Sequence, residues 1–211
     1  MAQNLKIKTF VNQRAFSCNV YVCSDGECSF IVDLGYYDSE IENYLKTIPP
    51  VKFVLQTHGH FDHIMGINAF AEKNPGVEYY CFNDEIEVIT NSRKNGSILA
   101  GTFYQPKVNF KTLSEGKINL FGFDIDVIHT PGHTAGSCMF YFENEKVVFT
   151  GDTLIETSIG RTDLPTGNEN DIYNSLKKIK ALTFSDDTEF YFGHGAPFKY
   201  VELIKYNSFL S

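Results

Sequence analysis

Short runs of apolar residues alternate with polar turns along the chain, and most of these runs are too short to form helices. They are rich in β-branched and aromatic residues, which are typical of strands. The pattern predicts strands at residues 6–10, 19–23, 28–32, 51–56, 77–82, 117–120, 124–129, 136–142, 146–149 and 189–192. A hairpin turn at Ser24-Asp25-Gly26 is expected between the second and third of them.

Other stretches repeat apolar residues at helical spacing. They predict helices at residues 38–47, 64–73, 83–90, 172–182 and 199–209. Asp38 or Ser39 is expected to cap the first helix. Strands and helices alternate in both halves, and no linker rich in Pro, Gly or Ser divides the chain. We therefore expect one α/β domain over residues 1–211, with a mixed sheet system covered by helices.

Residues 92–110 show neither helical nor strand periodicity, because Gly96, Gly101 and Pro106 interrupt any regular pattern. Loops of this length are usually functional, so we expect a surface loop that acts as a flap over a site. Phe103 and Tyr104 within it are expected to pack in the core or on the surface, with covering a substrate as the alternative.

Composition narrows the class of protein. The 211 residues are 43% hydrophobic and 21% charged, as in a globular protein and unlike a disordered one. The net charge of −8 argues against a nucleic-acid-binding protein, because phosphate contacts need concentrated positive charge. No apolar run reaches the ~18 residues of a membrane span. The first ten residues lack the apolar core of a signal peptide, so we expect a cytoplasmic protein whose mature chain begins at Met1.

The five cysteines form no Cys-x-x-Cys pair. An odd number of scattered cysteines in a chain without a leader indicates reduced thiols. Cys18, Cys23 and Cys28 lie five residues apart in or beside apolar runs, and we expect them to be buried rather than to bind a metal.

Metal-ligating side chains are concentrated where one predicted strand ends. Residues 57–63 read T-H-G-H-F-D-H directly after the strand at 51–56. Imidazole and carboxylate groups are ligands of Zn, Fe and Mn. His58 and His60 are two residues apart and point the same way in an extended loop, whereas the adjacent Asp62 and His63 can face a second point. The segment therefore predicts two metal ions close together.

Three further polar residues lie in similar positions. His133 lies in T-P-G-H-T between two strands, Asp152 lies in G-D-T after a strand, and His194 lies in G-H-G after the last strand. Each alone is an ordinary turn residue. Together with the first cluster they predict a site at an edge of the sheets.

These motifs, in this order, resemble the metallo-β-lactamase superfamily of hydrolases over nearly the whole chain. The resemblance implies a four-layer αββα sandwich with two divalent metal ions in a cleft at one edge of its two sheets. By the family pattern, His58, His60 and His133 hold one metal, Asp62, His63 and His194 hold the other, and Asp152 bridges them. Asp62 and Asp152 are then the catalytic carboxylates.

The implied chemistry is hydrolysis. Two cations lower the pKa of a shared water towards neutrality, so that hydroxide is available to attack a carbonyl carbon. Zn is the expected metal, with Fe or Mn as alternatives. A thiolate or carboxylate leaving group fits best, because the sequence offers no obvious acid to protonate another kind.

Two features bring the resemblance nearer to glyoxalase II than to β-lactamases. The β-lactamases often carry Cys where Asp152 stands or lack a histidine such as His63, and this chain has both residues. The stretch S-I-G-R-T-D-L-P at 158–165 is similar to small bacterial hydroxyacylglutathione hydrolases. Glyoxalase II adds a C-terminal helical domain that helps to hold glutathione, and the residues after His194 are too few for it. We expect a small-molecule thioester substrate such as S-D-lactoylglutathione, with the native thiol left open.

Roles outside the ligand set are less specific. Arg161 lies where this branch has a basic substrate contact, so it either binds a substrate carboxylate or forms an ion pair with Asp163. Asp33 ends a predicted strand and either orients a ligand histidine or forms a plain turn. His129 has no ligand role in the pattern, and we expect it to be packed or half-exposed.

Other activities share these motifs. A mononuclear iron persulfide dioxygenase has the same H-x-H-x-D-H motif and a Gly-Arg-Thr-Asp stretch, and a lactonase would use the same metals on a lactone carbonyl. A binding module that had kept only the fold would usually have lost ligands, whereas all seven are present. A nuclease is disfavoured by the acidic charge. The sequence leaves the oligomeric state and the metal open.

Overall fold

The computed structural model describes residues 5–12 and 18–210. Met1 and its first neighbours, on which the expected start of the mature chain rests, lie outside these ranges. Within them, no helix combines the length and the apolar character needed to cross a membrane.

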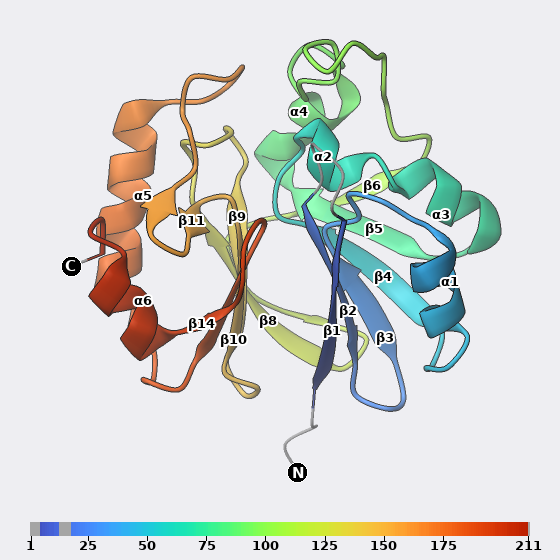
Figure 1. Ribbon diagram of the computed structural model, residues 1–211, viewed down its shortest axis with the longest axis horizontal. Coiled ribbons are helices and arrows are strands. Elements are labelled where there is room, and N and C mark those ends of the chain that lie inside the picture. The colour runs from blue at the N-terminus through green and yellow to red at the C-terminus, as the bar shows by residue number, and fades with distance from the viewer. Residues whose placement is uncertain (1–4, 13–17, 211) are drawn as a thin grey trace.

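Two six-stranded sheets form the centre of the molecule (Figure 1). The first has the order β1-β2-β3-β4-β5-β6, with bounds Lys6–Val11, Asn19–Ser24, Ser29–Val32, Val51–Gln56, Glu78–Phe82 and Phe110–Leu113. β1, β2 and β3 pair antiparallel, and β3 to β6 pair parallel.

The second sheet has the order β14-β13-β10-β9-β8-β7. In that order the strands are Phe198–Lys199, Glu189–Phe192, Val147–Gly151, Cys138–Phe142, Phe123–His129 and Gly116–Leu120. Neighbours from β7 to β10 are antiparallel, β13 is parallel to β10, and β14 is antiparallel to β13. A small ribbon of β11 (Leu154–Ile155) and β12 (Ser158–Ile159) follows β10.

Helices cover the outer faces of the two sheets. On the first sheet they are α1 (Ser39–Leu45), α2 (Phe61–Ile64), α3 (Ile67–Lys73) and α4 (Ile86–Thr90), and on the second α5 (Glu169–Ala181) and α6 (Tyr200–Tyr206). Figure 1 shows α1 and α3 on one side, α5 and α6 on the other, and the sheets between them. The predicted four-layer αββα sandwich is confirmed.

Aromatic residues fill the space between the sheets. Phe30 of β3 stacks on Phe53 of β4, with ring centroids 5.0 Å apart, and on Phe142 of β9 across the sandwich at 5.2 Å. Separate apolar clusters lie under the helices, around Phe70 of α3 and Leu176 of α5. A close-packed core of this kind resists deformation, so it holds the strand ends in fixed positions.

Local signals in the sequence are confirmed at several points. Asp38 caps α1, and its carboxylate accepts hydrogen bonds from the Glu40 and Ile41 backbone N–H groups at 3.0 and 3.1 Å. Gly26 has a φ of +96° in the predicted hairpin turn, a conformation that glycine adopts readily. All five cysteines are buried and free.

The helix predicted at 64–73 is in fact two helices, α2 and α3, which are interrupted at Met65 and Gly66. A Cβ at this position would lie 2.5 Å from the carbonyl carbon of Tyr36, so only glycine allows the approach. Its N–H donates a hydrogen bond to the Leu34 carbonyl at 2.9 Å. Asp62 and His63 consequently lie within the short helix α2 instead of preceding a helix.

Other elements also differ from the prediction. α5 starts at Glu169, before the expected 172, because the Asn168 side chain caps it by accepting from the Asp171 N–H at 3.1 Å. β6 was not predicted as a strand, since its sequence, Phe-Lys-Thr-Leu, shows little apolar alternation. Residues 92–109 are free of helix and strand, as expected.

Candidate metal centre

Four loops that follow strands meet at one edge of the sandwich. They follow β4 in the first sheet and β8, β10 and β13 in the second, where these three strands run in the same direction. The predicted ligands lie on these loops: His58, His60, Asp62 and His63 after β4, His133 after β8, Asp152 after β10, and His194 after β13. The structure brings all seven together.

The first predicted ligand set consists of His58, His60 and His133. Each offers a ring nitrogen, and these nitrogens lie within 4.8 Å of one another. All three residues are buried, and His60 Nδ1 lies 2.8 Å from His133 Nε2. His133 Nδ1 donates to the backbone carbonyl of Arg161 at 2.8 Å, which leaves its Nε2 facing the cluster.

The second predicted set consists of Asp62, His63 and His194, again with ligand atoms within 4.8 Å of one another. His194 Nε2 lies 3.3 Å from Asp62 Oδ2, and His63 Nε2 lies 3.8 Å from the same oxygen. His63 is fully buried, whereas Asp62 and His194 are partly exposed. This set faces solvent more than the first one does.

Asp152 lies between the two sets. Its Oδ2 is 3.5 Å from Nε2 of both His133 and His194, and its Oδ1 is 3.3 Å from His63 Nε2. One carboxylate therefore contacts both groups of ligands, which is the position that a bridging residue requires.

Unpartnered buried atoms test whether this cluster fits metal ions. Among the described residues, Nε2 of His58, His60 and His63 and Oδ1 of Asp152 are buried and have no hydrogen-bond partner. A buried polar atom left in this state costs about 1–3 kcal/mol. Burial, with His133 nearby, lowers the pKa of His60 to about 3, so the ring is neutral, which is the form that binds a metal. The donor set and its unpaired atoms fit divalent cations.

Asp33 lies behind His63. Its Oδ2 is 2.9 Å from His63 Nδ1, and its two oxygens also accept hydrogen bonds from the backbone N–H and hydroxyl of Thr57, at 2.8 and 2.7 Å. The φ of Asp33 is +52°, which Asp tolerates better than most residues. Engaging Nδ1 keeps Nε2 of His63 turned towards Asp62 and Asp152. This geometry is that of a residue which orients a ligand histidine.

Glu85 is a residue that the sequence did not single out. It has 0% exposure and ends a short 3-10 turn, Asn83–Glu85, ahead of α4. Burial raises the pKa of its carboxyl group to about 7, against the effect of three hydrogen bonds that it accepts. No local signal distinguishes it from Asp84 or Glu87 beside it, which are exposed.

A hollow of about 330 Å³ opens over the cluster. Its lining combines five predicted ligands with Phe61, Leu99, Ala100, Leu164 and Arg161. Leu99 and Ala100 belong to the 92–110 loop, so this loop does flank the site. Arg161 lines the hollow but also forms a two-point ion pair with Asp163, with both N···O distances at 2.6 Å. The predicted ion pair with Asp163 is therefore present, and binding of a substrate carboxylate by Arg161 stays a prediction.

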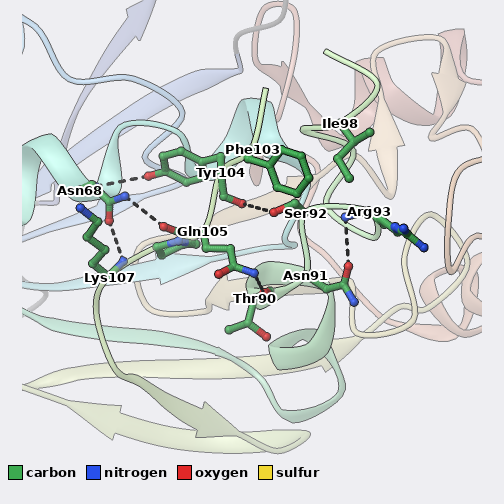
Figure 2. Close-up of a pocket in the computed structure, with 11 residues that line it drawn as sticks. Asn68, Thr90, Asn91, Ser92, Arg93, Ile98, Phe103, Tyr104, Gln105 and Lys107 are labelled. Carbon is green, nitrogen blue, oxygen red and sulfur yellow. Dashed lines mark hydrogen bonds between the residues drawn. The ribbon is translucent and has the colours of Figure 1, made fainter. Parts of the chain in front are cut away.

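Phe103 and Tyr104 of the same loop lie elsewhere. They line a second, larger hollow of about 880 Å³, shown in Figure 2, which none of the predicted ligands lines. Its polar groups bond to one another: Asn68 donates to the Gln105 carbonyl at 3.0 Å and accepts from the Lys107 N–H at 2.7 Å. The alternative that these two aromatic residues cover a substrate in the ligand hollow is not supported. The hydrogen bonds brace the loop against α3 and α4.

His129 is apart from the cluster, as expected. Its ring stacks on Phe82 with centroids 4.0 Å apart, and its Nε2 donates to the Ala135 carbonyl at 3.0 Å. Both contacts are those of a half-exposed structural histidine.

Comparison with known proteins shows the family of the chain. The model of the metallo-beta-lactamase superfamily matches residues 14–194. The chain is 32% identical to the probable metallo-hydrolase YqgX of Bacillus subtilis over 179 residues, 83% of each protein. It is also 32% identical to the hydroxyacylglutathione hydrolase GloC of Haemophilus influenzae, over 83% of this chain and 84% of GloC.

Solved structures agree with this result. The structure of the BLEG-1 B3 metallo-beta-lactamase superposes with a TM-score of 0.87 at 28% identity, covering 98% of this chain and 100% of that one. The di-iron-bound form of TTHA1623 superposes with a TM-score of 0.82 at 27% identity, covering 95% and 98%. With the fold, the ligand cluster and these matches together, the chain belongs to the metallo-beta-lactamase superfamily and is a metallo-hydrolase of that group.

Proposed function

We propose that the protein is a binuclear metal-dependent hydrolase that cleaves a small-molecule thioester, such as S-D-lactoylglutathione. The observation that carries this is the position of Asp152 between the two ligand sets, in which Nε2 of His58, His60 and His63 and Oδ1 of Asp152 are buried without a hydrogen-bond partner. The similarity to GloC, which is described as a hydroxyacylglutathione hydrolase, supports the thioester.

The proposed roles follow from the contacts. Bound divalent cations supply a nucleophile from water at neutral pH and polarise a carbonyl oxygen. His58, His60 and His133 would hold one cation, and Asp62, His63 and His194 the other, with Asp152 shared between them. Asp33 keeps the His63 ring in one orientation. Zn is the proposed metal, with iron as the main alternative because TTHA1623 was solved in a di-iron form.

The lining of the hollow indicates how a substrate would be held. Phe61, Leu99 and Leu164 contribute apolar surface to the lining, against which an acyl group would pack. Arg161 offers a guanidinium to a substrate carboxylate in exchange for Asp163. A thiolate leaves without needing a proton, so the site requires no general acid for this reaction. A cytoplasmic location suits the five free thiols.

The experiment is hydrolysis of S-D-lactoylglutathione by metal-loaded protein, with Asp152→Ala as control and metal counted per chain. Turnover by the wild type that is lost in the variant supports the proposal. Protein that holds two metals but leaves the thioester intact overturns the substrate.

A second candidate is hydrolysis of a β-lactam, favoured by the similarity to BLEG-1 over almost the whole of both chains. The same metal-loaded protein is assayed with a penicillin and a cephalosporin. Turnover of these, without turnover of the thioester, would favour this candidate.

A further inference from the structure

Glu85 connects the two loops that carry the first ligand set. Its Oε1 accepts a hydrogen bond from the Gly59 N–H at 2.7 Å, and Gly59 is the residue between His58 and His60. Its Oε2 accepts from the Thr134 hydroxyl at 2.9 Å and from the Gly136 N–H at 2.7 Å, both on the loop of His133. Each carboxylate oxygen thus serves a different loop.

The glycines in these two loops allow the carboxylate to approach. A Cβ at Gly136 would lie 2.3 Å from the Glu85 backbone nitrogen and 2.7 Å from its Oε2. A Cβ at Gly59 would lie 2.6 Å from Ile89 Cγ1 and 3.1 Å from Glu85 Oε1. The segment that carries Glu85 is therefore inserted tightly against both loops, and neither has room to shift towards it.

Three hydrogen-bond donors face the two carboxylate oxygens of Glu85, so each of the two loops needs an acceptor from this side chain. An amide at this position has one acceptor oxygen and one NH₂ group, and the NH₂ group would face a donor on one of the two loops. A carboxylate satisfies both loops, and charge strengthens each hydrogen bond. Since the glycine donors are backbone groups, the bonds fix the path of each loop and not only its side chains.

Burying a carboxylate is unfavourable for folding, and burial raises the pKa of Glu85 to about 7. A polar residue kept in the core at a cost to stability is typical of a functional position. Its contacts indicate what that function is, because they are all made to the loops of His58, His60 and His133.

We propose that Glu85 is a positioning residue for the first metal: it clamps the loop of His58 and His60 to the loop of His133, so that the three ring nitrogens stay within reach of one cation. This inference rests on the proposed metal centre. Groups that support metal ligands typically change metal affinity 10–100-fold when they are replaced.

The test compares wild type, Glu85→Gln and the matched control Asp84→Asn, which changes an exposed carboxyl on the same turn. Amide hydrogen exchange is measured in metal-free protein, and Zn²⁺ affinity is measured by competition with a chelator. For Glu85→Gln we expect exchange at Gly59 and Gly136 to rise at least tenfold, with core amides such as Val54 and Phe149 unchanged. Zn²⁺ binding should weaken about 10–100-fold. The control should match the wild type in both measurements.

Unchanged exchange at Gly59 and Gly136, or unchanged Zn²⁺ affinity, overturns the clamp. Faster exchange in the core as well would show that Glu85 serves the fold as a whole, and this also overturns it. Wild type that binds no Zn²⁺ disproves the metal centre, whereas the exchange of the two glycines still decides whether Glu85 joins the loops.

A second variant covers the case in which Glu85→Gln does not fold. Thr134→Val removes one donor and leaves the carboxylate in place. We expect faster exchange at Gly136, no change at Gly59, and Zn²⁺ binding weakened less than tenfold. Exchange and affinity equal to those of the wild type would overturn the proposal.

Discussion

The two predicted ligand sets differ in how firmly the chain holds them. In the first set all three histidines are buried, His133 is tied through Nδ1 to a backbone carbonyl, and Glu85 joins the loops. In the second set only His63 is fully buried, whereas the side chains of Asp62 and His194 are 25% and 38% exposed. Ligands that are already ordered lose less conformational entropy on binding, so we expect the first set to bind its metal more tightly.

In the second set, Asn19 holds the backbone on both sides of His194. The Asn19 backbone N–H donates to the Gly193 carbonyl at 2.7 Å, and its side-chain amide donates to the Gly195 carbonyl at 2.8 Å, so both sides of His194 are fixed. The side chains of Asp62 and His194 line the open hollow, as do those of His60 and His133 from the first set. The two sets therefore differ in the burial of their side chains and not in access to the hollow.

Removing the residue common to both sets should have the largest effect. We expect Asp152→Ala to lower kcat/KM for the thioester at least about a thousandfold and to reduce the metal content, because both sets lose a ligand. Turnover rates, metal per chain and circular dichroism measure this, with exposed Asp187→Ala as control. Loss of one metal only would show that Asp152 serves a single set, and wild-type turnover would disprove its role.

Glu85 joins the loops of the first set, and because its carboxyl group is buried, the free energy of unfolding should depend on pH. The pKa of Glu85 is about 7 in the folded chain against an ordinary 4.5, so the folded state binds more protons between these values. The free energy of unfolding must then fall as pH rises from about 4.5 to about 7, by up to about 3 kcal/mol for this one group. Urea unfolding of metal-free protein at pH 4.5 and 8 should show this loss relative to Glu85→Gln. A stability difference that does not change with pH would contradict it.

Changing the support of His63 should affect the second set more than the first, which Asp33 reaches only through Thr57. Asp33→Asn keeps a side chain that tolerates the positive φ, and it removes the charge that faces His63 Nδ1. We expect the weaker metal to dissociate about 10–100-fold more readily, with the tighter metal little changed. Metal titration that resolves two affinities measures this. Equal weakening of both would mean that the sets are not independent.

The smallest effect is expected at the rim of the hollow. Arg161→Ala should raise KM for an anionic thioester about 3–10-fold and leave kcat nearly unchanged, because an exposed binding contact is lost. Asp163→Asn should lower KM, because it frees the guanidinium. If neither variant changes KM, the ion pair with Asp163 is structural.

The alternation of strands, the long helices and the irregular 92–110 segment were predictable from local pattern. β6 and the break at Gly66 were not. A strand such as β6 is defined by its pairing with β5, and the break lies at Gly66, where the Tyr36 backbone leaves no room for a side chain. Both depend on neighbours distant in sequence, which periodicity does not record.

The site divides in the same way. The spacing of His58, His60, Asp62 and His63 predicted a metal site. The order of the later motifs indicated the metallo-beta-lactamase superfamily. Glu85 carried no signal, because its sequence neighbours are ordinary acidic residues at the start of a helix. Its partners lie 26, 49 and 51 positions away along the chain.

The sequence by itself determined the kind of ligands, the family that they belong to and the layered fold. The kind of ligands follows from residue types at short spacing, where side-chain chemistry is enough. The family and the layered fold follow from the resemblance of the ordered motifs, because local periodicity predicts only the individual strands and helices. Only the tertiary structure decided which residues support the ligand side chains. It also decided that Phe103 and Tyr104 line the second hollow and that the two ligand sets differ in burial. These outcomes arise from contacts between loops on different strands, which form only when the core packs and brings the strand ends to one edge.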